Sequence, residues 1–187
     1  MKKIFLVCTA LLVLAGTAAM AQTETRGAKM TVRVSDIDTS KADDTTLVGY
    51  VFMRHYSREY YESRDDFEKS IKKTFEMSEY LPTMEEVRAA ERLLLEQYPI
   101  IMPGKKDKWG KATRPRLKSY VRQYIFGVAS DGKRYVWINA VSKEETWLKD
   151  ELEKRLVHVR DGGHYFWQTL LNLDDGTMVF NMVNGEA

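Results

Sequence analysis

The chain has 187 residues, of which 44% are hydrophobic, 30% charged and 11% aromatic, and 29 basic side chains stand against 27 acidic ones. This length suits one ordinary domain, and the hydrophobic content excludes a collagen-like, low-complexity or wholly disordered protein. The near balance of charge gives no indication of a nucleic-acid or anionic-membrane partner.

Residues 1–21 have the three parts of a secretory signal peptide. Two lysines form the basic start, residues 4–15 are apolar, and Ala19-Met20-Ala21 is a small-x-small cleavage site. Cleavage after Ala21 would leave a single domain over residues 22–187, with a flexible leader at 22–29. We therefore expect an exported protein, periplasmic or extracellular, without a transmembrane segment in the mature chain.

The only cysteine, Cys8, lies inside the predicted signal peptide. The mature chain would therefore have no disulfide, no thiolate metal site and no cysteine nucleophile. The sequence also contains no serine-hydrolase elbow, zinc-protease helix motif, phosphate-binding loop or dinucleotide fingerprint. No catalytic residue and no cofactor is predicted.

Two strands are predicted at the start of the mature domain. Residues 30–35 alternate apolar and polar side chains, and residues 47–53 form a continuous apolar run. The acidic loop between them is spaced like the beginning of a calcium loop. However, Lys41 stands where the sharp turn needs glycine, and Leu47 stands where a bidentate glutamate would close the site. No metal site is predicted.

Two helices are predicted next. Over residues 64–80, aromatic and aliphatic side chains repeat every four residues and form one apolar stripe. The second helix begins at Thr83, an N-cap with Glu86 as its capping-box partner, and is expected to end before Pro99. Both apolar stripes are interpreted as core.

A basic segment interrupts the helical pattern between residues 98 and 117, where prolines and glycines recur. From Lys105 to Lys118 there are seven basic residues and one acidic residue. Two interpretations stay open: an anion-binding loop for a phosphate, an acidic glycan or an acidic partner, or a solvated connector. The candidate anion-binding residues are Lys105, Lys106, Lys108, Trp109 and Lys111.

The C-terminal part of the chain is predicted to form an antiparallel meander. Strands at 120–129 and 134–141 flank Asp131-Gly132, a preferred two-residue hairpin turn. A short helix then begins near Ser142, with Trp147 among its apolar contacts. Three further strands follow, at 156–160, 164–173 and 177–183. Helices followed by a meander predict an α+β fold, with the helices packed on one face of the antiparallel sheet.

The expected turn lengths decide which side chains share a face of the sheet. The last hairpin pairs Leu171 with Phe180, and both are expected on the helix-facing side with Trp167. In the first hairpin, Tyr124 and Trp137 are expected to share a face. Polar and aromatic side chains in these rows predict a concave ligand surface, and an ordinary solvated sheet face is the alternative. The candidate ligand-binding residues are His158, Arg160, His164, Phe166, Gln168, Asn172, Tyr124 and Trp137.

Four motifs stand out in the C-terminal half: Arg122-Gln123-Tyr124, Val136-Trp137-Ile138-Asn139, Asp161-Gly162-Gly163 with Phe166, and the ending 183–187. Through them this part of the chain resembles a family of short exported proteins from bacteroidete bacteria. The resemblance implies an envelope or secreted location, and that family has no assigned activity.

The segment Gln123-Tyr124-Ile125-Phe126-Gly127 is similar to the Q-x-V-x-G segment of cystatins, protease inhibitors with a helix packed on an antiparallel sheet. This resemblance implies a cystatin-like shape. In cystatins the segment is a hairpin tip that enters the protease cleft, whereas here the turn signal at Asp131-Gly132 places it within a strand.

Together these features predict a non-catalytic binding protein. The expected partner is an envelope protein, a peptide or a glycan, and not a nucleic acid. Two alternatives stay open: a small acid–base enzyme of NTF2-like shape, with a histidine or carboxylate held against aromatic walls, and a cystatin-like protease inhibitor.

Overall fold

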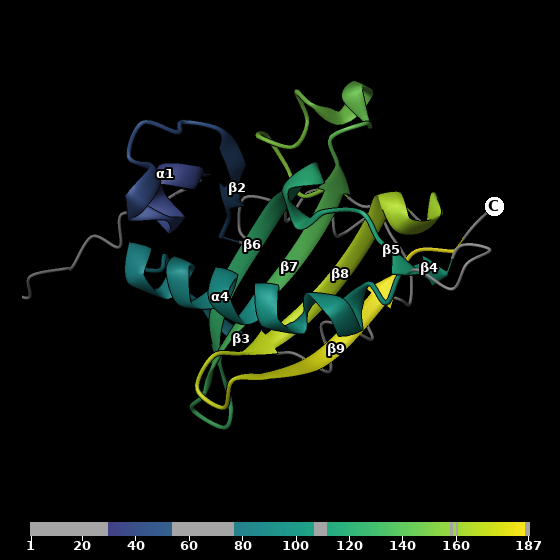
Figure 1. The fold of residues 1–187 in the computed structure, drawn as a ribbon. Helices are drawn as coiled ribbons and strands as arrows, with labels where there is room; N and C mark the ends of the chain where they lie inside the picture. Colours follow the sequence, from purple (N-terminus) through teal and green to yellow (C-terminus); the bar gives the residue numbers. More distant parts are fainter. Residues whose placement is uncertain (1–29, 54–76, 107–111, 158, 160, 186–187) are drawn as a thin grey trace, which may run out of the picture.

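The computed structural model describes residues 30–53, 77–106, 112–157, 159 and 161–185. They form a mostly antiparallel sheet of seven strands with a few helical segments, an α+β architecture (Figure 1). The strands of this sheet are β1 (Met30–Arg33), β2 (Leu47–Val51), β3 (Met77–Glu79), β6 (Tyr120–Ala129), β7 (Arg134–Ser142), β8 (Phe166–Asn172) and β9 (Thr177–Val183). A separate two-stranded sheet contains β4 (Lys105–Lys106) and β5 (Ala112–Thr113).

Within the described ranges, the helical segments are short except for one. They are α1 (Val34–Ile37), α4 (Met84–Ile101) and the 3-10 turns η1 (Thr39–Lys41), η3 (Leu117–Ser119), η4 (Thr146–Leu148) and η5 (Gly163–Tyr165). The order of strands in the large sheet is β1-β2-β6-β7-β8-β9, with β3 also on β6.

One edge of β6 is shared by two strands. Its first half pairs with β2 in parallel, and its second half pairs with β3 in the antiparallel sense. The expectation of a wholly antiparallel sheet is therefore wrong for the β2–β6 pair. Strand β3 also replaces the predicted end of the first helix, because Gly127 lets Met77 approach: a Cβ on Gly127 would lie 2.5 Å from the Met77 Cβ. Residues 64–76 of that predicted helix lie outside the described residues.

Helix α4 begins where the sequence predicts. The Thr83 hydroxyl accepts from the Glu86 N–H at 3.3 Å, and the Glu86 carboxylate accepts from the Thr83 N–H at 2.9 Å, which confirms the capping box. The predicted stop before Pro99 is wrong, since the helix continues to Ile101. A proline this close to the C-terminal end removes one helical N–H while its fixed φ still fits the helix.

Helix α4 lies across one face of the large sheet, which we call the helix face (Figure 1). Its apolar stripe packs on side chains from the central strands, and Trp167 is fully buried there, as predicted. The buried residues that α4 contributes are Val87, Ala90, Leu93, Leu94, Tyr98 and Ile101. This cluster is the main hydrophobic core.

The opposite face, which we call the outer face, carries a second cluster. Leu148, Leu152 and Leu156 from the segment 143–157 pack there on β6, β7 and β8 side chains, so helical segments contact both faces. The predicted strand at 156–160 is absent among the residues that the structure describes in that stretch. Instead of hydrogen bonds between strands, side chains buried in the sheet bind the backbone of this stretch.

Both predicted hairpin registers are wrong. The first hairpin has a three-residue loop, 130–132, with Gly132 at φ 78°, which shifts the register by one and places Tyr124 and Trp137 on opposite faces, Trp137 on the outer one. The last hairpin has a four-residue loop, 173–176, and a bulge between Leu170 and Leu171. Phe180 therefore pairs with Leu170 and lies on the outer face rather than the helix face.

Candidate functional site

The structure brings only part of the predicted ligand-binding set together. Trp137, Phe166, Gln168 and Asn172 share the outer face, whereas Tyr124 lies on the helix face. The shared face predicted for Tyr124 and Trp137 is therefore wrong. Asn172 is committed to the β8–β9 turn, where its side-chain oxygen accepts from two backbone N–H groups.

The remaining predicted residues are placed as follows. His164 lies in η5, half-buried, with its ring stacked on Tyr165 at 4.4 Å between centroids. The backbones of Lys105 and Lys106 form β4, one arm of the small hairpin. His158, Arg160, Lys108, Trp109 and Lys111 lie outside the described residues.

A charged cluster that the sequence analysis did not identify is buried on the helix face. Arg122 on β6 donates from Nε and Nη2 to the two carboxylate oxygens of Glu91 on α4, at 2.8 and 2.9 Å. The Tyr124 hydroxyl donates to the same carboxylate at 2.6 Å. Arg122 Nη1 donates to the backbone oxygens of Leu117 and Tyr120. We call Glu91, Arg122 and Tyr124 the closed cluster, because its polar groups are bonded to one another and to the backbone.

The electrostatics of the closed cluster fix the protonation states of Arg122 and Tyr124. Burial opposes a charge on Arg122, but Glu91 outweighs burial and raises the pKa of the guanidinium above its ordinary value. Burial also raises the pKa of the Tyr124 hydroxyl well above its ordinary value. Arg122 therefore stays charged and Tyr124 stays neutral, an arrangement that serves structure rather than proton transfer. Glu91 was detectable in the sequence as an acid inside the apolar stripe of α4.

The outer face carries an uncharged counterpart, which we call the amide ladder: Gln123, Asn139 and Gln168. These residues occupy directly opposed positions on β6, β7 and β8. Asn139 Nδ2 donates to Gln123 Oε1 at 3.0 Å, and Gln168 Nε2 donates to Asn139 Oδ1 at 3.1 Å. All three side chains are at least 98% buried. The ladder therefore links three strands through their side chains.

The Gln123 end of the amide ladder holds the segment 143–157. Gln123 Nε2 donates to the carbonyl oxygens of Leu152 and Arg155 at 2.8 and 2.7 Å, and Gln123 Oε1 accepts from the Val157 N–H at 2.9 Å. Asn139 Nδ2 donates to the Val157 carbonyl oxygen at 2.7 Å. These bonds satisfy backbone groups that a strand would otherwise pair.

The Gln168 end of the amide ladder has an acceptor without a partner among the residues described. Gln168 Oε1 is buried and has no hydrogen-bond partner within the described part of the chain, and the same holds for Trp137 Nε1. Both side chains face outward from adjacent strands, and Trp137 packs beside the outer-face cluster. Buried polar atoms are almost always hydrogen-bonded, so these two atoms are unusual. In the described residues, Trp167 Nε1, Asn181 Oδ1 and Asn184 Oδ1 are also buried without a partner.

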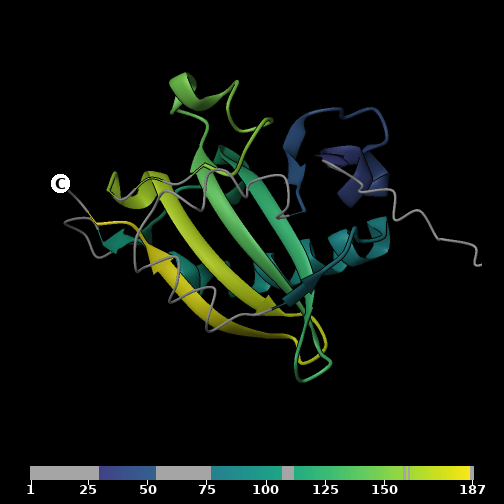
Figure 2. The ribbon, with the colours of Figure 1, turned by 180° about the vertical axis from the view of Figure 1, so that it is seen from behind.

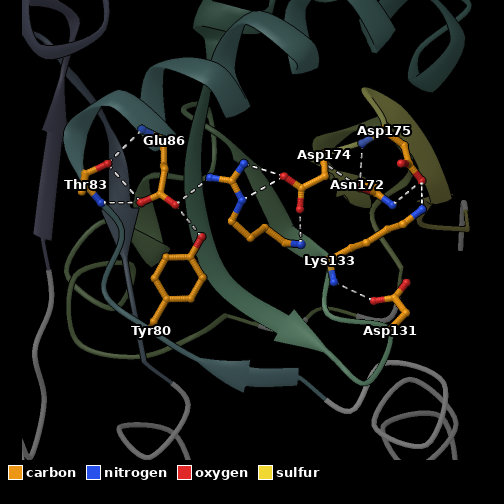
Figure 3. A network of polar contacts seen from close by, with 9 residues as sticks. Tyr80, Thr83, Glu86, Asp131, Lys133, Asn172, Asp174 and Asp175 are labelled. Carbon is orange, nitrogen blue, oxygen red and sulfur yellow. Dashed lines mark hydrogen bonds and ion pairs between the residues drawn. The ribbon is translucent and has the colours of Figure 1, made fainter.

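A surface network joins the start of α4 to the tips of both C-terminal hairpins (Figure 3). Arg134 donates to Asp174 at 2.9 Å and to Glu86 at 3.3 Å, and Lys133 donates to Asp175 at 2.6 Å. The hydrogen bond from Arg134 lowers the pKa of Asp174 below its ordinary value. Because its acids and bases are bonded to one another, the network acts as a clamp between elements.

The structure offers no metal centre in the residues it describes, since no three histidine, cysteine, aspartate or glutamate side chains gather there in a way that could hold an ion. None of the helices over the described ranges is both long enough and apolar enough to cross a membrane.

Comparisons with known proteins add no family to this description. No protein-family model matches the sequence, and neither a curated protein nor a solved structure matches it.

Proposed function

We propose that this chain is an exported, non-catalytic binding protein whose ligand contacts the outer face at Trp137 and Gln168. The observation that carries the proposal is a buried donor and a buried acceptor there, neither of which has a hydrogen-bond partner among the residues that the structure describes. A ligand that supplies the missing partners would remove the cost of leaving those atoms unpaired, about 1 to 3 kcal/mol for each. Export rests on the signal-like residues 1–21, and the expected location is periplasmic or extracellular.

The chemistry of this pair favours a ligand with peptide groups. A peptide group offers a carbonyl oxygen to the Trp137 indole N–H and an N–H to Gln168 Oε1. Trp137 and Gln168 are diagonal neighbours on β7 and β8, and such positions lie about 7 to 8 Å apart at Cα. A short extended segment of a protein or peptide spans that separation.

Two observations favour binding over the alternative functions, which are acid–base catalysis and protease inhibition. Glu91, the buried carboxylate of the helix face, is bonded to Arg122 and Tyr124, so it is poorly suited to act as a free general base. Gln123 is fully buried in the middle of β6, which is a poor position for a protease-binding tip. A cystatin-like or NTF2-like shape stays a prediction.

The test measures the nuclear magnetic resonance signal of the Trp137 indole N–H. The isotope-labelled protein is titrated with pools of acetylated, amidated pentapeptides, and its tryptophan indole signals are assigned with Trp→Phe variants. The proposal predicts that one pool shifts the Trp137 indole signal and that Trp137→Phe weakens binding of that pool at least tenfold. Trp167→Phe, on the helix face, is the matched control and should leave binding unchanged. A Trp137 signal that no pool shifts would overturn the proposal.

A further inference from the structure

Trp147 is the only aromatic residue among the large apolar side chains that the structure describes as exposed, and 68% of it is accessible. This exposure contradicts the apolar contact predicted for it. The segment 143–157 that carries Trp147 projects beyond the end of the sheet, as the green segment at the top of Figures 1 and 2 shows. Its neighbour Leu148 is 98% buried, so the same turn contains one anchored and one exposed side chain.

The backbone that follows Trp147 is held by apolar packing and by hydrogen bonds. Leu148 and Leu152 fill the outer-face cluster, and Gln123 binds the carbonyl groups of Leu152 and Arg155. A segment fixed in this way loses little conformational freedom when it binds a partner. Trp147 is therefore presented on a preorganised support.

The indole ring is also fixed. Its Nε1 donates to Glu145 Oε2 at 2.6 Å, so the polar edge of the ring is already satisfied. What the exposed side chain offers to a partner is its flat apolar surface. The adjoining positions are polar and exposed: Glu144, Thr146, Lys149 and Asp150.

We infer that Trp147 is a stacking platform for a ring of a neutral glycan. A pyranose ring has an apolar C–H face of about the size of an indole and a rim of hydroxyl groups. Carboxylates such as Glu144 and Asp150 accept strong hydrogen bonds from such groups. A protein partner fits less well, because a stable protein interface needs about 800 Å² on each side with its anchor surrounded by other contacts, whereas the exposed positions that adjoin Trp147 in the chain are polar.

The inference is tested by native electrophoresis in gels that contain one neutral polysaccharide: hydroxyethyl cellulose, xyloglucan, galactomannan or starch. At least one polysaccharide should retard the protein relative to a plain gel. Trp147→Ala should lose at least nine-tenths of that retardation, and Trp147→Phe should keep part of it, because a ring remains to stack. Since Trp147 is exposed, the circular dichroism of both variants should match wild type.

Two controls separate this site from others. Leu95→Ala removes another exposed apolar side chain, 64% accessible on α4, and should keep full retardation. Trp137→Phe should also keep it, so loss of peptide binding at the outer face leaves this inference intact. A wild-type protein that none of the four gels retards, or equal retardation of wild type and Trp147→Ala, would overturn the inference.

Discussion

The two faces of the sheet each bury a polar row, and the rows end differently. On the helix face, Glu91, Arg122 and Tyr124 are charged or hydroxyl groups whose bonds close on one another and on the backbone. On the outer face, Gln123, Asn139 and Gln168 are neutral amides, and the Gln168 oxygen has no partner in the part of the chain that the structure describes. Arg122 and Gln123 are adjacent residues of β6, and each belongs to one of the two rows.

This difference gives the two rows different capacities to bind a ligand. A closed set of buried polar groups fixes the packing of α4 on β6 and leaves nothing for a ligand to bind. The amide ladder instead holds the segment 143–157 at its Gln123 end. At its Gln168 end it leaves an acceptor without a partner among the described residues. Four measurements test whether the two rows differ in this way.

The largest effect is expected when the closed cluster loses one partner. Arg122→Met leaves Glu91 as an uncompensated buried carboxylate and should lower the free energy of unfolding by about 3 to 5 kcal/mol. The double variant Glu91→Leu with Arg122→Met should recover most of that loss, because both charges are gone. Urea unfolding measures both. A double variant as unstable as Arg122→Met would show that shape, and not unpaired charge, dominates this site.

The amide ladder should show a smaller and more local effect. Gln123→Leu removes the groups that pair the carbonyls of Leu152 and Arg155 and the N–H of Val157, and should cost about 2 to 3 kcal/mol. Hydrogen exchange should accelerate most at Val157 and least in α4. Equal acceleration at both places would mean that Gln123 supports the whole fold rather than the segment 143–157.

Removing the unpaired donor of the outer face should change stability little. Trp137→Phe deletes an indole N–H that has no partner among the described residues, so the free energy of unfolding should stay within about 1 kcal/mol of wild type. Thermal unfolding without ligand measures this. A loss above about 2 kcal/mol would indicate that the indole is chiefly a packing element.

The smallest effect concerns the surface clamp and depends on pH. The pKa of Asp174 is lowered by the hydrogen bond from Arg134, so the stability it contributes is present at neutral pH and is lost as the pH falls through that lowered pKa. Asp174→Asn should cost less than about 1 kcal/mol at pH 7. Urea unfolding from pH 6 to pH 3 should show a weaker pH dependence in this variant, and an unchanged dependence would contradict the assignment.

The sequence predicts the elements of this protein better than their register. The capping signal at Thr83 and the strand pattern of β6 to β9 lie in local residue types, and these elements are present. Register depends on the loop between strands: a left-handed Gly132 fits a three-residue loop as well as a two-residue turn. That one-residue difference separates Trp137, on the outer face, from Tyr124, on the helix face.

Trp137 and Gln168 are both among the predicted ligand-binding residues, but the contacts of the amide ladder and of the closed cluster escaped prediction for a related reason. Gln123 and Asn139 satisfy the backbone of residues 152–157 with side chains, and this kind of pairing has no sequence period. Glu91 follows the helical period of the apolar stripe, but its partner Arg122 lies 31 residues away in the sequence. Local residue patterns do not predict contacts between residues so far apart.

The amide ladder also has a thermodynamic consequence, because the two proposed sites lie at its two ends. A ligand bonded to Gln168 would polarise and restrain Asn139 and then Gln123, which holds the segment that presents Trp147. Linkage then requires reciprocity: whatever factor a bound peptide applies to the affinity for a glycan, the glycan applies to the affinity for the peptide. A row of three amides would thus make one chain respond to two ligands together.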